Sequence, residues 1–396
     1  MAEVLTQRVY LDWNATAPLR PQARAAVLEA LDLCGNPSSV HAEGRAAHRL
    51  IEQAREEVAA LVGAESRNVV FTSGGTEANA LALSPGTGSG RNGAARPRLL
   101  LSAIEHPSVL AGGRFEIGAV EKLPVVRDGR IDLDALEARL AALAAASLRR
   151  PLVSVMLANN ETGIVQPVDE AARIVHELEG ILHVDAVQAA GRIPCDINEI
   201  GADLLTISGH KIGGPMGVGA LVRRDAALGF APLLTGGGQE RSARAGTQNV
   251  AAIAGFGAAA SAASRGLAAD ALKMRSLRER LESGLRAAMP DVIIFGADVD
   301  RLPNTTLFAA PGMKAETAVI AIDLKGVAVS SGAACSSGKV QPSHVLAAMG
   351  VAPERARGAV RVSLGATTRE YEIDRFLKAW IEVSETLLKA SKGIAA

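Results

Sequence analysis

Lys211 is the residue of this chain best placed for covalent chemistry. It lies in Ser208–Gly214, a run of mostly small residues that leaves its amine in cramped, partly desolvated surroundings. An apolar run that starts at Ile181 ends in Asp185, 26 positions before Lys211. A protein that uses pyridoxal phosphate (PLP) supplies an amine to form a Schiff base and a carboxylate to hold the pyridinium nitrogen. Lys211 and Asp185 therefore predict an enzyme that acts on an amino acid.

A phosphate site is predicted at Gly74–Glu77, where an apolar strand meets the start of a helix. Backbone N–H groups in the first turn of a helix are unpaired, and the helix dipole favours an anion there. The Thr76 hydroxyl can add a contact, and Ser208 and His210 lie close enough to Lys211 to reach the same phosphate. Each feature alone has an ordinary alternative: a glycine turn with a helix cap, a solvated lysine or a capping aspartate. The combination favours the PLP site.

Three further polar residues are candidates for contact with the cofactor or the substrate. His106 follows another predicted strand, where it can stack on the cofactor ring and transfer protons; the alternative is a loop histidine. Arg361 is flanked by apolar residues, and its guanidinium can bind a substrate α-carboxylate in bidentate fashion or form an internal salt bridge. Asn160 is either a substrate contact or a turn residue.

Cys335 stands out because nothing bulky or apolar surrounds it. The segment Ser330–Lys339 contains four serines and two glycines, which predicts a loop that is free to swing. A free thiol is only a few per cent thiolate at neutral pH, yet it is strongly nucleophilic. Cys34 and Cys195 lie among ordinary helix or strand residues and are interpreted as structural. Thr247 lies in a glycine-rich polar loop, and its spacing alone leaves a phosphate contact open.

Composition excludes several classes of function. Lys+Arg and Asp+Glu number 42 each in 396 residues, so no global field attracts nucleic acid or an anionic membrane. Three distant cysteines argue against a disulfide framework and favour a reducing cytoplasm. No secretory segment is expected at the amino terminus. The histidines show no ligand spacing, and no metal is expected. Hydrophobic residues make up 48% and aromatics 3%, so the core must be aliphatic.

The pattern of elements predicts an α/β fold with a mostly parallel sheet and helices on both faces. Ligands of such sheets bind beyond the carboxyl ends of the strands, where the candidate residues above are found. Two domains are expected from the length: a large domain over 16–264 and a small domain formed by 1–15 and 265–396. Short apolar strands are predicted at 9–11, 69–72, 99–101, 153–156, 181–184 and 204–207. Helices are predicted at 21–33, 42–62, 250–264, 269–288 and 369–388, and one from 76 onward.

The chain closely resembles the PLP-dependent cysteine desulfurases of the NifS/IscS type, which are fold-type I, class V aminotransferase-like enzymes. The resemblance implies a seven-stranded, mostly parallel sheet flanked by helices, with a smaller α+β domain that carries the cysteine loop. The matching segments extend over nearly the whole chain: Tyr10–Asp12, Gly35–Ser38, Phe71–Glu77, Glu105–His106, Asn159–Glu161, His183–Asp185, Ser208–Lys211, Arg244–Thr247, Ser330–Cys335 and Arg361–Gly365.

The resemblance implies a role at each matching position. The residues that would hold the cofactor are Lys211 (Schiff base), Asp185 (pyridinium nitrogen), Gln188 (ring hydroxyl), His106 (ring stacking), and Gly75, Thr76, Ser208 and His210 (phosphate). Thr247 would reach the phosphate of a neighbouring subunit, which implies a homodimer with shared sites. Asn160 and Arg361 would hold the substrate carboxylate, and Cys335 would accept sulfur.

The implied reaction converts L-cysteine to L-alanine and leaves a persulfide on Cys335. The long, serine-rich segment resembles the branch of the family that passes sulfur to an iron–sulfur scaffold protein. The family commonly has serine at position 333 and often threonine at 336, where this chain has Ala333 and Ser336; this difference bears on the choice of sulfur acceptor and not on the chemistry. Alternatives are a selenocysteine lyase, another class V aminotransferase, or a non-catalytic sulfur-relay module.

Overall fold

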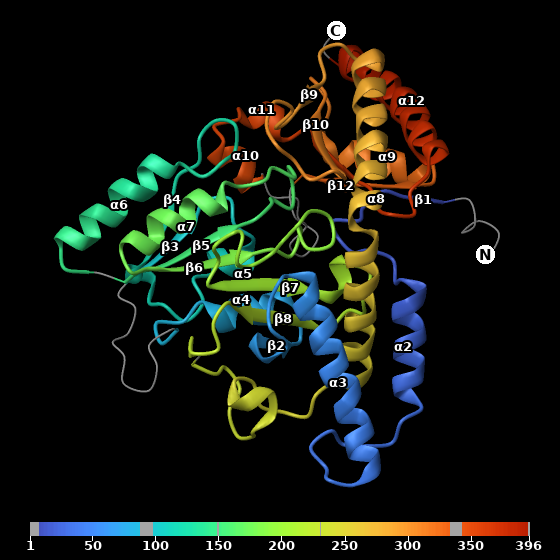
Figure 1. The fold of residues 1–396 in the computed structure, drawn as a ribbon. Coiled ribbons are helices and arrows are strands. Elements are labelled where there is room, and N and C mark those ends of the chain that lie inside the picture. Colours follow the sequence, from blue (N-terminus) through green and yellow to red (C-terminus); the bar gives the residue numbers. More distant parts are fainter. Residues whose placement is uncertain (1–7, 88–97, 149, 230, 333–342, 395–396) are drawn as a thin grey trace.

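A seven-stranded sheet forms the centre of the molecule in the computed structural model (Figure 1). The structure describes residues 8–87, 98–148, 150–229, 231–332 and 343–394. The strand order is β2-β8-β7-β6-β5-β3-β4, and every neighbouring pair is parallel except the two that β8 makes. The mostly parallel sheet that was predicted is therefore confirmed. Its strands are Val69–Thr72 (β2), Leu99–Ser102 (β3), Val120–Leu123 (β4), Leu152–Met156 (β5), Ile181–Asp185 (β6), Leu204–Ser208 (β7) and Gly219–Arg223 (β8).

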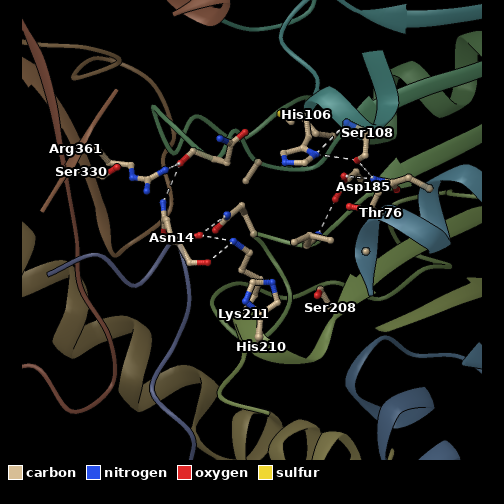
Figure 2. A pocket seen from close by; sticks show the side chains of 18 of the residues that line it. Asn14, Thr76, His106, Ser108, Asp185, Ser208, His210, Lys211, Ser330 and Arg361 are labelled. Atoms are coloured by element: carbon tan, nitrogen blue, oxygen red, sulfur yellow. Dashed lines mark hydrogen bonds between the residues drawn. The ribbon is translucent and has the colours of Figure 1, made fainter. Parts of the chain in front are cut away.

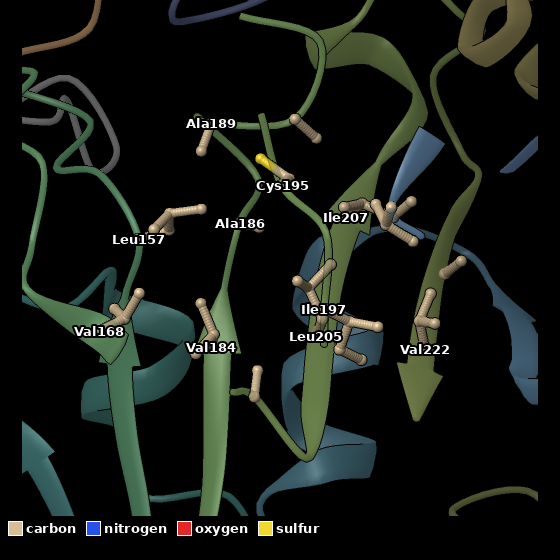
Figure 3. Close-up of a cluster of buried hydrophobic side chains, with 14 of the residues drawn as sticks. Leu157, Val168, Val184, Ala186, Ala189, Cys195, Ile197, Leu205, Ile207 and Val222 are labelled. Atoms are coloured by element: carbon tan, nitrogen blue, oxygen red, sulfur yellow. The ribbon is translucent and has the colours of Figure 1, made fainter. Parts of the chain in front are cut away.

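Helices cover both faces of this sheet (Figure 1). Successive side chains of a strand point to opposite faces, so Leu100 packs into one core while Leu99 and Leu101 pack into the other. The larger core, part of which Figure 3 shows, lies against α3, α6, α7 and α8, and the smaller one against α4 and α5. The helices are Pro21–Leu31 (α2), Ala42–Leu61 (α3), Gly75–Ala82 (α4), Pro107–Leu110 (α5), Leu133–Ala145 (α6), Val168–Glu177 (α7), Val250–Ala288 (α8), Ala315–Leu324 (α9), His344–Ala348 (α10), Pro353–Ala356 (α11) and Glu370–Ile394 (α12).

A second, smaller sheet has its own apolar core. Its strand order is β12-β13-β10-β9, and a separate parallel pair joins β1 to β11. Phe308 and Trp380 meet edge to face in this core with ring centroids 4.8 Å apart, and α9 and α12 cover it. The predicted domain boundaries, 16–264 against 1–15 and 265–396, stay predictions. The strands are Val9–Tyr10 (β1), Ile293–Ile294 (β9), Thr305–Ala309 (β10), Val327–Ala328 (β11), Ser330–Ser331 (β12) and Ala359–Ser363 (β13).

The longest helix, α8, differs from the sequence prediction. Two helices were predicted, at 250–264 and 269–288, whereas the structure has one continuous helix of 39 residues. Its first part packs against α2 and α3 and its last part against α12 (Figure 1). Within the described residues it is the one helix long and apolar enough to cross a membrane, but 56% of its apolar window is buried inside the protein, as in a core helix.

Two of the three cysteines lie within the described residues. Cys195 belongs to the large core (Figure 3), where burial raises the pKa of its thiol to about 12. This environment agrees with the structural role predicted for it. Cys34 is exposed after the end of α2.

Candidate active site

A cavity of about 580 Å³ opens at the carboxyl ends of β6 and β7 and extends to β12 and β13 of the smaller sheet. Figure 2 shows that side chains from both sheets point into it. Predicted site residues from six separate segments of the chain line this one cavity: Gly75, Thr76, His106, Asn160, Asp185, Gln188, Ser208, His210, Lys211 and Arg361.

Lys211 lies in a single turn, Gly209–Lys211, directly after β7. Its Nζ donates to the backbone carbonyls of Asn14 (2.5 Å) and Ala15 (2.8 Å). Burial, together with the positive charges of Arg192 and Arg361, lowers the pKa of the amine to about 7. An amine with this pKa is substantially neutral, and therefore nucleophilic, at neutral pH.

Arg192 is a buried cation that sequence reasoning missed. It donates to the Gln188 side chain (2.8 Å) and to the backbone carbonyl of Lys211 (3.3 Å). Burial lowers the pKa of the guanidinium to about 10. No motif marks Arg192, because its importance comes only from the fold that brings it beside Lys211. Gln188, which it holds, also donates to the Asn14 carbonyl (3.0 Å).

Asp185 ends β6 and is 5% exposed. Its Oδ1 accepts the Val187 backbone N–H (3.0 Å) and its Oδ2 accepts from Asn79 Nδ2 (2.8 Å). Asn79 was also missed, although it follows Thr76 by three positions on α4, and residues three apart on a helix share a face. That spacing was the signal that could have identified it.

His106 faces the cavity and is hydrogen bonded to Ser108 (Figure 2). Its Nδ1 lies 2.8 Å from Ser108 Oγ and accepts the Ser108 backbone N–H at 3.2 Å. Although the ring is accessible from the cavity, desolvation by the surrounding protein lowers the pKa of the imidazole; Asp185 opposes this shift, and Lys211 and His344 add to it. The neutral ring is therefore the dominant form at neutral pH.

The predicted phosphate residues surround the start of α4. A second cavity of about 510 Å³ adjoins the first and shares Gly75, Thr76, Ser208 and His210 with it. A Cβ added at Gly75 would lie 3.0 Å from Val187 Cγ2, so a side chain there would crowd the cradle. Burial lowers the pKa of His210 to about 4, and its Nδ1 lies 3.2 Å from Thr16 Oγ1.

Arg361 of β13 lines the cavity and pairs with Ser330 of the neighbouring strand β12. It forms an ion pair with Asp12 (2.8 Å) and donates to the backbone carbonyl of Asn160 (2.8 Å). The internal salt bridge left open by the sequence is thus present. Among the residues that the structure describes, no acceptor lies within hydrogen-bonding distance of the buried Nε atom.

Two buried carboxyl groups lie next in sequence to residues that line the cavity, Glu105 before His106 and Glu161 after Asn160. Burial raises the pKa of Glu105 well above its usual range, and nearby Asp185 adds to this effect; its Oε1 accepts the Met156 N–H (2.6 Å). Burial raises the pKa of Glu161 to about 7, and its Oε2 accepts from Ser343 Oγ (2.5 Å). Ser343 also caps α10.

Two predicted site residues are not among those lining the cavity. Thr247 is exposed and lines a separate cavity of about 210 Å³ with Arg244. Arg244 binds Glu77 of α4 (2.9 Å), which ties the Thr247 loop to the phosphate cradle. Cys335 lies outside the residues that the structure describes.

The residues around the cavity fit PLP. The Lys211 amine, with its lowered pKa, follows β7, and the buried Asp185 carboxylate ends the adjacent parallel strand β6, so both reach the same space. The helix start at Gly75, where a side chain would crowd Val187, adjoins them and suits a phosphate. Lys211 would hold the cofactor covalently, and Asp185 would keep its ring nitrogen protonated.

Comparisons with known proteins agree with this geometry. The aminotransferase class-V family model matches residues 9–376. A cysteine desulfurase of Cereibacter sphaeroides is 44% identical over 94% of both chains, and a cysteine desulfurase IscS of Dictyoglomus turgidum is 38% identical over 97% of this chain and 96% of its own. The crystal structure of a NifS-like protein from Rickettsia africae covers 96% of this chain and 100% of its own, with a TM-score of 0.86 and 38% identity. The chain therefore belongs to the cysteine desulfurases, PLP-dependent enzymes of the aminotransferase class-V family.

Proposed function

We propose that this protein takes sulfur from L-cysteine, releases L-alanine and carries the sulfur as a persulfide on Cys335. The observation that carries the proposal is the Lys211 amine, whose pKa of about 7 leaves it substantially neutral in a cavity that it shares with the buried Asp185. PLP, when bound, supplies an electron sink that allows the Cα–H and Cβ–S bonds of the substrate to break.

Lys211 is proposed to move the Cα proton. A neutral Nζ can accept a proton from Cα, and the protonated amine can return it, because a pKa near the working pH suits both directions. His106 would hold a second proton at the cavity through its neutral ring.

Substrate binding is proposed to exchange partners at Arg361. The substrate α-carboxylate would take the bidentate place that Asp12 now occupies in part, with Asn160 beside it. Binding would then fix Cα relative to Lys211, and such positioning lowers the barrier by removing orientational freedom before the reaction.

The sulfur step balances without an added oxidant. The Cys335 thiolate attacks the substrate sulfur, an S–S bond forms as the Cβ–S bond breaks, and Cβ gains a proton to become the alanine methyl group. The substrate carbon is reduced, and the two sulfur atoms are oxidised to the persulfide level. This assignment of Cys335 rests on its sequence context, which resembles that of the family.

The same proposal includes the oligomeric state, the sulfur acceptor and the location of the protein. We expect a homodimer in which Thr247 completes the phosphate site of the neighbouring subunit, and an iron–sulfur scaffold protein or another sulfur acceptor as the recipient of the sulfur. The cytoplasm is the proposed location, because a reducing compartment keeps the acceptor thiol free.

Mass spectrometry of the protein after incubation with L-cysteine tests the reaction. Cys335 should gain one sulfur atom while alanine appears in solution, and Cys335→Ser should retain the bound cofactor but lose both products. Cys34→Ser is the matched control, because Cys34 is an exposed free thiol whose replacement should leave both products unchanged. Full alanine production by Cys335→Ser would reject the persulfide route.

A further inference from the structure

We propose that Asn79 and Ser108 are positioning residues that connect Asp185 to His106 and fix which imidazole nitrogen carries the proton. The inference deepens the proposed function, since it assigns a defined tautomer to the histidine at the reacting centre. It rests on a continuous line of hydrogen bonds along one side of the cavity (Figure 2).

The line begins at the carboxylate of Asp185, which can only accept when ionised. Asn79 Nδ2 donates to Asp185 Oδ2 (2.8 Å) and also to Ser108 Oγ (2.9 Å). A flipped Asn79 amide would turn its oxygen toward the carboxylate oxygen, which repels it. Asp185 therefore selects the amide orientation in which both N–H groups of Asn79 point along the line.

The Asn79 side chain keeps an orientation that leaves one of its buried polar atoms without a hydrogen bond. It is 1% exposed, and its Oδ1 has no hydrogen-bond partner within the described part of the chain. A buried amide that leaves its acceptor unpaired retains this orientation only because both donors are strongly held. The unpaired Oδ1 is therefore independent support for an orientation set by Asp185.

Ser108 passes this orientation to His106. Because Ser108 Oγ accepts from Asn79, its hydroxyl hydrogen is free to point to His106 Nδ1, 2.8 Å away. The Ser108 backbone N–H, which can only donate, also points to Nδ1 at 3.2 Å. Two donors at one nitrogen require a lone pair there, so Nδ1 is unprotonated and the proton of the neutral ring lies on Nε2.

The charged and titratable groups that influence His106 are Asp185, Lys211 and His344. Of these, Asp185 favours a cationic ring, whereas Lys211 and His344 oppose it. If Nδ1 were protonated, its N–H would face the two donors of Ser108, the hydroxyl and the backbone N–H. The line of hydrogen bonds thus keeps the ring neutral beside a carboxylate, with Nε2–H as the proton available for transfer.

Nitrogen NMR of the holoenzyme with isotope-labelled histidine tests this assignment without relying on turnover. His106 is identified among the seven histidines by the signal that His106→Gln removes. In the wild type we expect the Nε2–H tautomer at neutral pH. In Ser108→Ala and in Asn79→Leu, the Nδ1–H tautomer should become populated and the pKa of His106 should rise. Nδ1 loses its hydroxyl donor in the first variant, and in the second it loses the amide that orients this donor. Ser108→Thr keeps a hydroxyl and should restore the wild-type tautomer.

Kinetics give a second readout. Both disrupting variants should lower kcat by about fivefold, the equivalent of one neutral hydrogen bond, with KM for cysteine unchanged. Ser154→Ala is the matched control: it removes a similar serine–imidazole contact, 2.8 Å to His183 within the sheet, and should leave the His106 tautomer and pKa as in the wild type.

A wild-type tautomer and pKa for His106 in both Ser108→Ala and Asn79→Leu would overturn the proposal, and so would an equal change in Ser154→Ala. If Asn79→Leu does not fold, the contrast between Ser108→Ala and Ser108→Thr decides. Failure of the proposed function is a separate result, in which the wild type makes no alanine from cysteine whatever the His106 tautomer.

Discussion

At the scale of single residues, the reactivity of Lys211 arises from its surroundings. A lysine in water has a pKa near 10.4, so only a trace is neutral at pH 7. Desolvation is the largest cause of the reduction to about 7, followed by the positive charge of Arg192. The buried Arg192 is held by Gln188 and by the carbonyl of Lys211 itself, so its charge stays beside the amine.

Replacing Arg192 should therefore raise the pKa of Lys211. In Arg192→Gln the protonated amine loses a repulsive neighbour, and we expect its titration midpoint to move up by about one pH unit. Acetylation of the cofactor-free protein at a series of pH values, quantified at Lys211 by mass spectrometry, measures this midpoint. Arg173→Gln is the control, since Arg173 forms an exposed ion pair with Glu177 on α7. An unchanged midpoint in Arg192→Gln would show that the charge of Arg192 does not contribute to the lowered pKa.

The site residues found from the sequence share one property. Lys211 and Asp185 follow apolar strands, and the order of a parallel sheet brings such positions together. Asn79, Ser108 and Arg192 have no such marker. The spacing from Thr76 could place Asn79 on the same face of α4, but only the folded chain reveals its contact with Asp185 across 106 positions of sequence.

At the scale of elements, five of the seven strands of the large sheet were located correctly because they are buried on both faces and read as continuous apolar runs. Two of its strands were missed: Glu121 and Lys122 interrupt the apolar residues of the edge strand β4, and β8 has only three apolar residues between Gly219 and Arg223. The single helix α8 was predicted as two because Gly266 and a change to charged residues interrupt the pattern. A glycine costs a helix only about 1 kcal/mol, and packing of both ends of α8 offsets that cost.

A buried ion pair fixes the second half of α8 to the smaller sheet. Glu282 accepts from Arg301 (2.8 and 3.1 Å) and from Thr306 (2.9 Å). Glu282→Ala leaves Arg301 buried without its carboxylate and should lower the free energy of unfolding by about 3–5 kcal/mol, measured by urea denaturation. Asp374→Ala is the control: it breaks an exposed pair between α12 and Arg280 of α8 and should cost at most about 1 kcal/mol. Equal losses in the two variants would contradict this assignment.

The pair also predicts a dependence on pH. Burial alone would raise the pKa of Glu282, but the hydrogen bonds and charge of Arg301 outweigh it, and the net pKa is lowered. A carboxyl whose pKa is lower in the folded state stabilises the fold above its unfolded pKa, near 4.3. This contribution should disappear as pH falls through the lowered folded value, and the acid side of the stability curve should flatten in Glu282→Ala.

At the scale of the whole molecule, the cavity is formed by segments from both sheets and from the amino-terminal region. The carbonyls of Asn14 and Ala15 hold Lys211, and Arg361 reaches in from the smaller sheet. Thr247 alone among the described candidates lines a different cavity. In the proposed homodimer, a partner subunit would bring its own Thr247 to this site.

Hybrid dimers test whether the sites are shared. When a Lys211→Ala subunit pairs with a Thr247→Asp subunit, one shared site has both native residues and the other has neither, so the purified hybrid should have about half the wild-type activity. Each variant alone should be far less active, since Lys211→Ala lacks the amine and Thr247→Asp places a negative charge against the phosphate. Differently tagged, co-expressed subunits allow isolation of the hybrid, and alanine production measures its activity.

The matched control carries the same two substitutions on one subunit and pairs it with a wild-type subunit. In shared sites each cavity of this second hybrid then has one defect, so it should be nearly inactive although it contains a complete wild-type chain. If every site were built from a single chain, the order would reverse: the second hybrid would keep one intact site and the first would have none. The two hybrids contain identical sets of residues and differ only in their distribution between subunits, so general destabilisation cannot produce the expected difference.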